Sequence, residues 1–128
     1  MTTNIKQEVS PKVIYPELSY KLIGILFNTH KELGSYAREK QYADLIEKKL
    51  KESNLLYKRE LAIANTGNIL DFLIDKKIIL ELKSVREVTS EHYRQIQNYL
   101  QQTKIKLGIL VNFRSASLKP SRIIRINS

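Results

Sequence analysis

The chain has 128 residues and no cysteine, which suits one compact domain and excludes disulfides, thiolate metal sites and cysteine nucleophiles. Its hydrophobic content of 42% and charged content of 27% are ordinary for a globular protein, and the net charge is +9. No apolar run is long enough to cross a bilayer, and residues 1–10 lack the apolar core of a signal peptide. We therefore expect a cytoplasmic protein that has no membrane partner.

The first 16 residues are polar and contain Pro11 and Pro16, which predicts a flexible N-terminal arm over residues 1–16 and a single domain over residues 17–128. Apolar residues at helical spacing then predict a helix over residues 17–33, with Gly34 ending it. The same spacing predicts a second helix over residues 38–53.

Further along the chain, β-branched and apolar runs predict five strands and one more helix. The predicted strands cover residues 55–63, 68–74, 78–83, 106–113 and 122–127, and the helix covers residues 89–102. Thr89 or Ser90 would cap that helix. The order ααβββαββ indicates an α/β (α+β) fold in which helices flank a mixed central sheet.

The second and third predicted strands form a hairpin that brings three chemical groups together. If the turn centres on Lys76, Asp71 lies directly across from Glu81, and Lys83 points to the same side of the sheet. Two carboxylates held this close inside apolar strands repel each other and are costly to desolvate. A hard divalent cation such as Mg²⁺ or Mn²⁺ would remove that penalty. The pattern D-x9-E-x-K therefore indicates a metal site with an attendant ammonium, and the alternative is a simple ion pair between Lys83 and Glu81.

Two helical residues could add to this site. Glu39 opens the second predicted helix on the stripe that also carries Tyr42, so it is a candidate third oxygen ligand; the alternative is an acid that interacts with the helix dipole. Gln95 shares a helix face with His92 and Tyr99, and it is a candidate to hold a phosphate oxygen or a water. An ordinary polar helix surface is the alternative there.

The positive charge is concentrated after Glu91, the last acidic residue of the chain. A basic segment of this kind supplies phosphate contacts and steers nucleic acid electrostatically, although a solvated surface is the usual alternative. The candidate nucleic-acid-binding residues are Arg94, Lys104, Lys106, Arg114, Lys119 and Arg122.

The order of Glu39, Asp71, Glu81, Lys83 and Gln95 along the predicted helices and strands resembles that of the PD-(D/E)XK nuclease superfamily. Within this superfamily, the chain resembles the GxxExxY proteins. The resemblance covers the chain from about residue 18 onward. The matching stretches are THKELG, EKQY, DFLIDKKIILELKSV, HYRQIQNYL and KLGILVNF. Two positions depart from the family pattern: Tyr36 replaces the glycine of the family's naming motif, and Leu70 replaces a proline before the first acid.

The resemblance implies a restriction-endonuclease-like core in which Asp71 and Glu81 bind the metal and Lys83 is the signature lysine. It further implies that Glu39 is the helix-borne acid and that Gln95 lies near the site.

The function expected from these residues is a Mg²⁺- or Mn²⁺-dependent nuclease that hydrolyses phosphodiester bonds in DNA, with RNA as the alternative substrate. Asp71, Glu81 and the backbone carbonyl of Leu82 would hold the ion, with Glu39 as a further ligand through a water, and Lys83 would act on the attacking water or on the charge of the phosphate. The alternative is a catalytically silent nucleic-acid-binding or regulatory module on the same fold. A chain this small covers little of a duplex, so a homodimer is a reasonable expectation.

Overall fold

The computed structural model describes residues 14–126, so most of the predicted N-terminal arm, residues 1–13, lies outside the described residues. Ile14 and Tyr15 already pack against the core. Eight elements follow in the predicted order: α2 (Pro16–Leu33), α3 (Glu39–Glu52), β1 (Tyr57–Ala62), β2 (Ile69–Ile74), β3 (Ile78–Lys83), α4 (Ser90–Thr103), β4 (Leu107–Asn112) and β5 (Ser121–Ile124). None of the helices within residues 14–126 combines the length and apolar character that a bilayer crossing needs.

The helix boundaries follow local signals in the sequence. Pro16 stands at the start of α2, where its missing N–H costs nothing. Gly34 ends α2 with a φ of 76°, a conformation that favours glycine, and its N–H donates to the carbonyl of His30. At the start of α3 the Gln41 side chain accepts a hydrogen bond from the Arg38 N–H at 2.9 Å. These signals lie within a few residues of each boundary, which is why the sequence predicted the boundaries closely.

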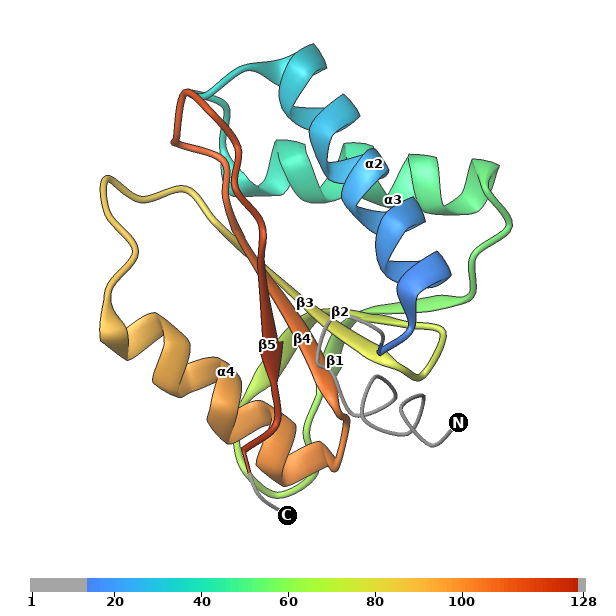
Figure 1. Cartoon of the computed structure of the whole chain (residues 1–128), viewed down its shortest axis with the longest axis vertical. Coiled ribbons are helices and arrows are strands. Elements are labelled where there is room, and N and C mark those ends of the chain that lie inside the picture. Colours follow the sequence, from blue (N-terminus) through green and yellow to red (C-terminus); the bar gives the residue numbers. More distant parts are fainter. Residues whose placement is uncertain (1–13, 127–128) are drawn as a thin grey trace, which may run out of the picture.

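The five strands form one sheet in the order β1-β2-β3-β4-β5. Only the β3–β4 pair is parallel, and α4 makes the connection between these two strands. Helices α2 and α3 cover one face of the sheet and α4 covers the other (Figure 1). The predicted α+β architecture, with a mixed sheet flanked by helices, is confirmed. The last strand is shorter than predicted, since it ends at Ile124.

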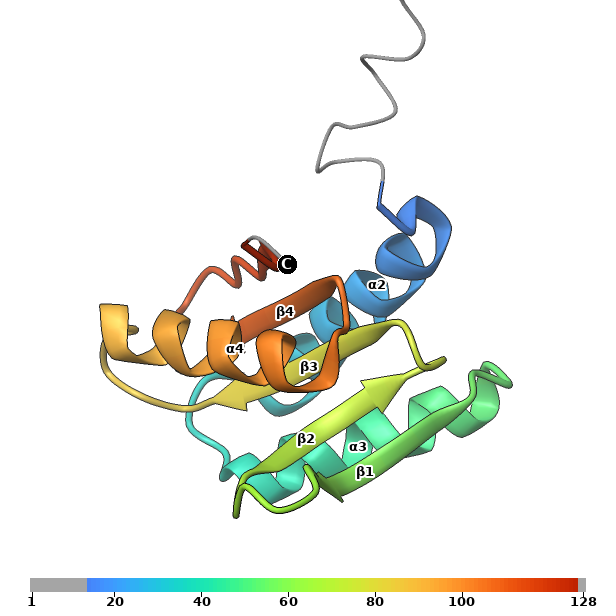
Figure 2. The ribbon, with the colours of Figure 1, turned by 90° about the horizontal axis from the view of Figure 1, so that it is seen from below.

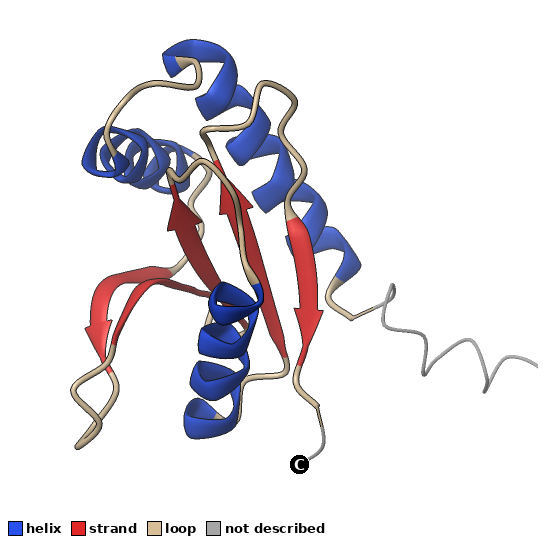
Figure 3. Ribbon diagram, turned by 90° about the vertical axis from the view of Figure 1, so that its left-hand side faces the viewer, coloured by secondary structure: helices blue, strands red, loops and turns tan. Residues whose placement is uncertain are grey.

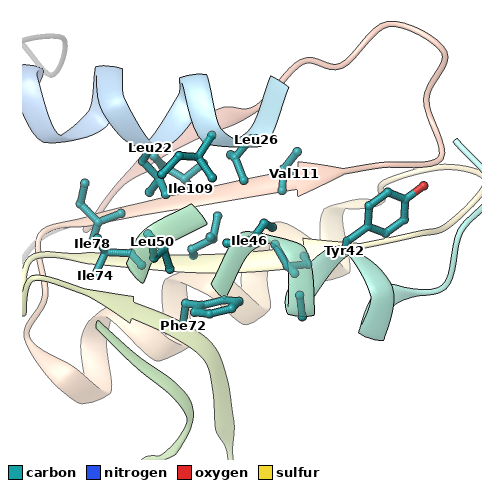
Figure 4. Packing of buried hydrophobic residues seen from close by; sticks show 14 of the residues in the cluster. Leu22, Leu26, Tyr42, Ile46, Leu50, Phe72, Ile74, Ile78, Ile109 and Val111 are labelled. Carbon is teal, nitrogen blue, oxygen red and sulfur yellow. The ribbon is translucent and has the colours of Figure 1, made fainter. Parts of the chain in front are cut away.

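The larger part of the core lies between the sheet and helices α2 and α3 (Figure 4). Its fully buried members include Leu22, Leu26, Ile46, Leu50, Phe72 and Ile109. The ring of Tyr42 stacks on Phe113, with centroids 4.2 Å apart and an interplanar angle of 11°. This aromatic pair joins the first turn of α3 to the end of β4, and both segments lead into the candidate site.

The second part of the core lies under α4, which crosses in front of β3 and β4 in Figure 2. Ile96 and Leu100, whose four-residue separation predicts that both face inward, are buried there. Tyr93 lies three residues before Ile96, a spacing that predicts an inward-facing side chain, but it is 40% exposed and Tyr99 is buried in its place. The buried stripe of α4 is therefore displaced toward the side that carries Gln95 and Tyr99.

Gly108 allows α4 to approach β4 closely. A Cβ at this position would lie 3.0 Å from Cγ2 of Ile96, a β-branched side chain with few alternative rotamers, and 3.7 Å from Cδ2 of Leu100. We expect Gly108→Ala to lower the free energy of unfolding by about 1–2 kcal/mol because the helix must move outward. Urea denaturation measures this change.

The matched control for that experiment is Gly24→Ala. Gly24 lies in the middle of α2 with open space around its Cα, so the same substitution should stabilise the protein by about 0.5–1 kcal/mol. Equal effects at both positions would show that close packing at Gly108 is not what requires glycine.

The pairing between β1 and β2 is interrupted at Glu60. Arg59 pairs with Phe72 and Leu61 with Leu70, but the pair that would lie between them is missing. Glu60 has a φ of 53°, in the left-handed region that non-glycine residues rarely adopt. Such an interruption bends the strands, and the curved pair at the left of Figure 3 shows this bend. Asp71 of β2, opposite Glu60, is thereby left without a backbone pair on β1.

The outer edge of β5 is covered by side chains of α4. Gln97 donates from Nε2 to the carbonyl of Ile124 at 2.7 Å and accepts at Oε1 from the N–H of Ile126 at 3.1 Å. Gln101 donates to the carbonyl of Ile126 at 2.6 Å. The Gln97 amide thus makes the two hydrogen bonds that a residue of a sixth strand would make. Covering of this kind is a known way to protect a sheet edge.

Candidate functional site

The hairpin of β2 and β3 has the predicted register. Phe72 pairs with Leu80, and the pairs that follow toward the turn are symmetric about Lys76. Continued by one residue beyond Phe72 and Leu80, this register sets Asp71 opposite Glu81. The backbone pairing between the two strands ends at this point, so β2 and β3 separate there. We call this place, formed by Asp71 and Glu81, the carboxylate fork.

At the carboxylate fork, side chains replace the missing backbone bonds. The N–H of Asp71 donates to Oε2 of Glu81 at 2.8 Å, and the N–H of Leu82 donates to Oδ2 of Asp71 at 2.8 Å. The interruption at Glu60 has a role here, because it frees the Asp71 N–H from β1. Each carboxylate is therefore held by the backbone of the opposite strand, and the two acids are fixed in position.

Burial and mutual repulsion disfavour charge at the carboxylate fork. Glu81 is only 4% exposed, and its burial, followed by the nearby charge of Asp71, raises its pKa to about 8. Burial also raises the pKa of Asp71, against the lowering effect of the Leu82 N–H, and the charge of Glu39 adds to the rise. One of the two carboxyls thus holds a proton at neutral pH unless a cation compensates their charge.

Lys83 lies beside the fork, on the α4 side of the sheet. Strand alternation puts Lys83 on the same face as Glu81, and its Nζ is 3.3 Å from Oε1 of Gln95. The charge of Lys83 lowers the pKa of both fork carboxyls. The structure therefore brings Asp71, Glu81, Lys83 and Gln95 together. His92, on the same helix face, accepts at Nδ1 from the Thr89 N–H at 3.0 Å and caps α4.

Glu39 lies on the α3 side of the fork. Its Oε2 accepts a hydrogen bond from the N–H of Ser84 at 3.0 Å, which anchors the chain just after Lys83. Glu39 is exposed, contrary to its expected position on the core-facing stripe, because it stands at the very start of the helix, beyond the region that the sheet covers. With Asp71 and Leu82 it lines a cleft of about 250 Å³. Within residues 14–126, no three His, Cys, Asp or Glu side chains are grouped closely enough to hold a metal ion by themselves.

Tyr99 belongs to the same region, although the sequence pattern does not single it out as a site residue. It is 6% exposed, and its pKa is raised first by burial and then by the charges of Glu81 and Asp71. Together with Lys83 and Gln95 it lines a second cleft, of about 340 Å³, on the α4 side. The sequence feature that could have identified Tyr99 is its position four residues after Gln95, which places both side chains on one face of the helix.

The predicted nucleic-acid-binding residues divide between the two ends of the sheet. Arg94 lines the second cleft and pairs with Glu91 at 3.0 Å. Arg114 and Lys119 are exposed on the loop after β4, at the end of the sheet where β3 finishes; we call this the fork end.

The other basic residues lie elsewhere. Lys104 and Lys106 precede β4 at the opposite end, where Leu107 pairs with Ile78, roughly 17 Å along the strand from Lys83. Arg122 is half-buried and donates to the carbonyl of Ile14 at 2.9 Å, and burial lowers its pKa. The structure therefore gathers only Arg94, Arg114 and Lys119 at the fork end.

Comparison with known proteins gives one match. A family model described as the PD-(D/E)XK nuclease superfamily matches residues 16–126. No curated protein and no solved structure matches the chain significantly. The matched range includes every helix and strand described above and the whole of the carboxylate fork.

Proposed function

Because the chain belongs to the PD-(D/E)XK nuclease superfamily, we propose that it is a metal-dependent nuclease that hydrolyses phosphodiester bonds in DNA, with RNA as the alternative substrate. Its mixed five-stranded sheet with helices on both faces has the restriction-endonuclease-like fold. The observation that carries the proposal is the carboxylate fork, where the buried Glu81 and the half-buried Asp71 oppose each other next to a lysine. We further propose that residues 17–128 form a single nuclease-like domain.

The oxygen atoms at the fork fit a hard divalent cation. Two carboxylates whose ionisation is disfavoured by burial and by each other provide the donors that Mg²⁺ or Mn²⁺ prefers. The carbonyl of Leu82 is directed toward β2: the Lys83 carbonyl accepts from Phe113, just after β4, and successive residues direct their carbonyls to opposite edges of a strand. Asp71, Glu81 and the Leu82 carbonyl would hold the cation, with Glu39 contributing through a water.

A bound cation of this kind supplies neutralising charge and polarises the scissile phosphate. Residues of the chain would orient the nucleophile and stabilise the charge of the transition state. Lys83 has three N–H donors, and its contact with Gln95 leaves the others for the attacking water and for a phosphate oxygen. In these positions the ammonium orients the nucleophile and stabilises negative charge in the transition state. Glu39 holds Ser84 and so keeps the end of β3 in place.

Substrate binding would come from Arg94, Arg114 and Lys119, which are exposed at the fork end. Contacts of basic side chains with phosphates give affinity without base specificity. We therefore propose selectivity for the structure of the nucleic acid rather than for its sequence. The basic residues at the opposite end of the sheet, Lys104 and Lys106, could bind the same strand only if it runs along the molecule.

The direct test is a cleavage assay with labelled single- and double-stranded DNA and RNA in Mg²⁺, Mn²⁺ or EDTA, at two salt concentrations. We expect cleavage that requires the metal and that is lost in Glu81→Gln, because the fork then lacks one of its two charges. Glu52→Gln, which changes an exposed acid at the end of α3, is the matched control and should cleave normally. Absence of cleavage with every metal and substrate would contradict the proposal.

The rival function is a catalytically silent nucleic-acid-binding or regulatory module. The exposed cations at the fork end favour it, since phosphate binding by Arg94, Arg114 and Lys119 needs no metal. The same assay separates the two functions. Retention of nucleic acid in EDTA that weakens with salt, without cleavage in any metal, would identify the silent module.

The finer family assignment is also a proposal. The order of the stretches around Glu39, Asp71, Glu81 and Gln95 supports membership of the GxxExxY proteins. Tyr36, in the position of the family's glycine, is the departure from this pattern. Cytoplasmic location and a homodimer remain predictions from the sequence.

A further inference from the structure

Tyr36 is an exposed aromatic residue at the fork end that the proposed nuclease chemistry does not use. It lies on the loop between α2 and α3, and its side chain is 83% exposed. The guanidinium carbon of Arg114 lies 5.2 Å from the centre of its ring, within the range of a cation–π contact. The residue before Arg114 is Phe113, whose N–H donates to the Lys83 carbonyl at 2.8 Å. Arg114 is therefore one residue along the chain from the backbone partner of Lys83, the lysine of the proposed chemistry.

The loop that carries Tyr36 is held from below by the hydroxyl of Tyr42. This hydroxyl accepts from the N–H of Ala37 at 3.2 Å and donates to the carbonyl of Gly34, so it ties together the residues on both sides of Tyr36. Tyr42 is fully buried and stacks on Phe113, the residue next to Arg114. One buried aromatic pair thus positions both members of the exposed pair.

The two loops are also joined directly. Ser35 donates from Oγ to the carbonyl of Ser115 at 3.2 Å, and the same Oγ lies 3.2 Å from Nε2 of His30. The α2–α3 loop and the β4–β5 loop lie side by side at the top of Figure 1 and of Figure 3. The exposed ring is therefore presented by an ordered support, and little conformational freedom remains to be lost when something binds to it.

We propose that Tyr36 and Arg114 form a stacking site for an unpaired nucleobase of the substrate strand. Aromatic rings and guanidinium planes stack on any base, and this interaction is a common way to bind single strands. Bases inside a duplex have both faces covered by their neighbours. The substrate is therefore a single strand, or a duplex end or junction with an unpaired base at the cleaved site. This inference rests on the proposed function.

The test measures binding to a single-stranded oligonucleotide that carries 2-aminopurine, and to a blunt duplex of the same sequence, both in EDTA so that no cleavage occurs. Quenching of the 2-aminopurine fluorescence reports stacking. We expect Tyr36→Ala to raise the Kd for the single strand by about 5- to 100-fold and to abolish the quenching, with the Kd for the duplex unchanged. Tyr36→Phe keeps the ring and should stay within about twofold of the wild type.

Tyr20→Ala is the matched control. Tyr20 is 81% exposed, but it lies on α2 and not on the loop, so its removal should change neither the Kd nor the quenching. Equal single-strand Kd values for the wild type and Tyr36→Ala would overturn the inference, and so would an equal loss of affinity for strand and duplex. A wild type that binds no oligonucleotide would overturn it as well.

Failure of this inference differs from failure of the nuclease proposal. If metal-dependent cleavage occurs but Tyr36→Ala leaves Kd and KM unchanged, the stacking site is refuted and the nuclease stands. If binding and quenching depend on Tyr36 but no metal supports cleavage, the stacking site stands and the nuclease is refuted.

Discussion

Replacing Lys83 by alanine is expected to lower kcat for cleavage by about two to three orders of magnitude, the usual effect of removing one donor that stabilises transition-state charge. Stabilisation by Mg²⁺ should remain, because Lys83 provides no oxygen ligand and the carboxylate fork is intact. The two measurements are kcat from cleavage kinetics and the shift of Tm on addition of Mg²⁺. Glu81→Gln should lose both.

The matched control is Lys76→Ala, which removes an exposed lysine from the turn of the same hairpin, far from the fork. It should leave kcat and the Tm shift at their wild-type values. A Lys83→Ala enzyme with unchanged kcat would exclude Lys83 from the chemistry. Loss of the Tm shift in that variant would instead make Lys83 a structural support of the acids.

The second large effect concerns stability as a function of pH. The pKa of Glu81 is about 8 in the folded protein and has an ordinary value of 4.5, so between these values the folded state keeps a proton that the unfolded state releases. The free energy of unfolding of the metal-free protein must then fall as pH rises from about 4.5 to 8. Asp71, whose pKa is also raised, changes stability in the same direction.

Urea denaturation in EDTA at pH 5, 6.5 and 8 measures this dependence. We expect a loss on the order of a few kcal/mol across the range in the wild type and a much smaller loss in Glu81→Gln, which cannot ionise at this position. Addition of Mg²⁺ at pH 8 should restore stability to the wild type and not to Glu81→Gln. Glu52→Gln should behave as the wild type does. A wild type whose stability is constant or rises over this range would show that the acids are not buried against each other.

The sequence predicted the hairpin and its register because both depend on local features. Two β-branched runs separated by Asp75, Lys76 and Lys77 favour one tight turn, and the two-residue period of a strand then sets which side chains face each other. A three-residue turn often carries a bulge that shifts the pairing by one residue, but the pairing of β2 with β3 is not shifted. The opposition of Asp71 and Glu81 follows from these features alone.

Other parts of the site depend on tertiary structure and could not be predicted in this way. The left-handed conformation of Glu60, which releases the Asp71 N–H from β1, has no sequence signal, since no glycine stands there. Tyr99 rather than Tyr93 is buried in the core, and which of the two is buried depends on how α4 is rotated about its axis over β4. Along the sequence, no acidic residue interrupts the basic residues after Glu91. In the structure, α4 runs away from the fork and β4 runs back toward it, so Lys104 and Lys106, which lie between them, are at the opposite end of the sheet.

The Gln97 amide has a consequence for how the molecule associates. Its two bonds occupy the Ile124 carbonyl and the Ile126 N–H, so a polypeptide that adds to the end of β5 would first have to displace Gln97 from these two groups. Gln97, together with Gln101, therefore disfavours the pairing of protomers in a continuous sheet through this end of β5.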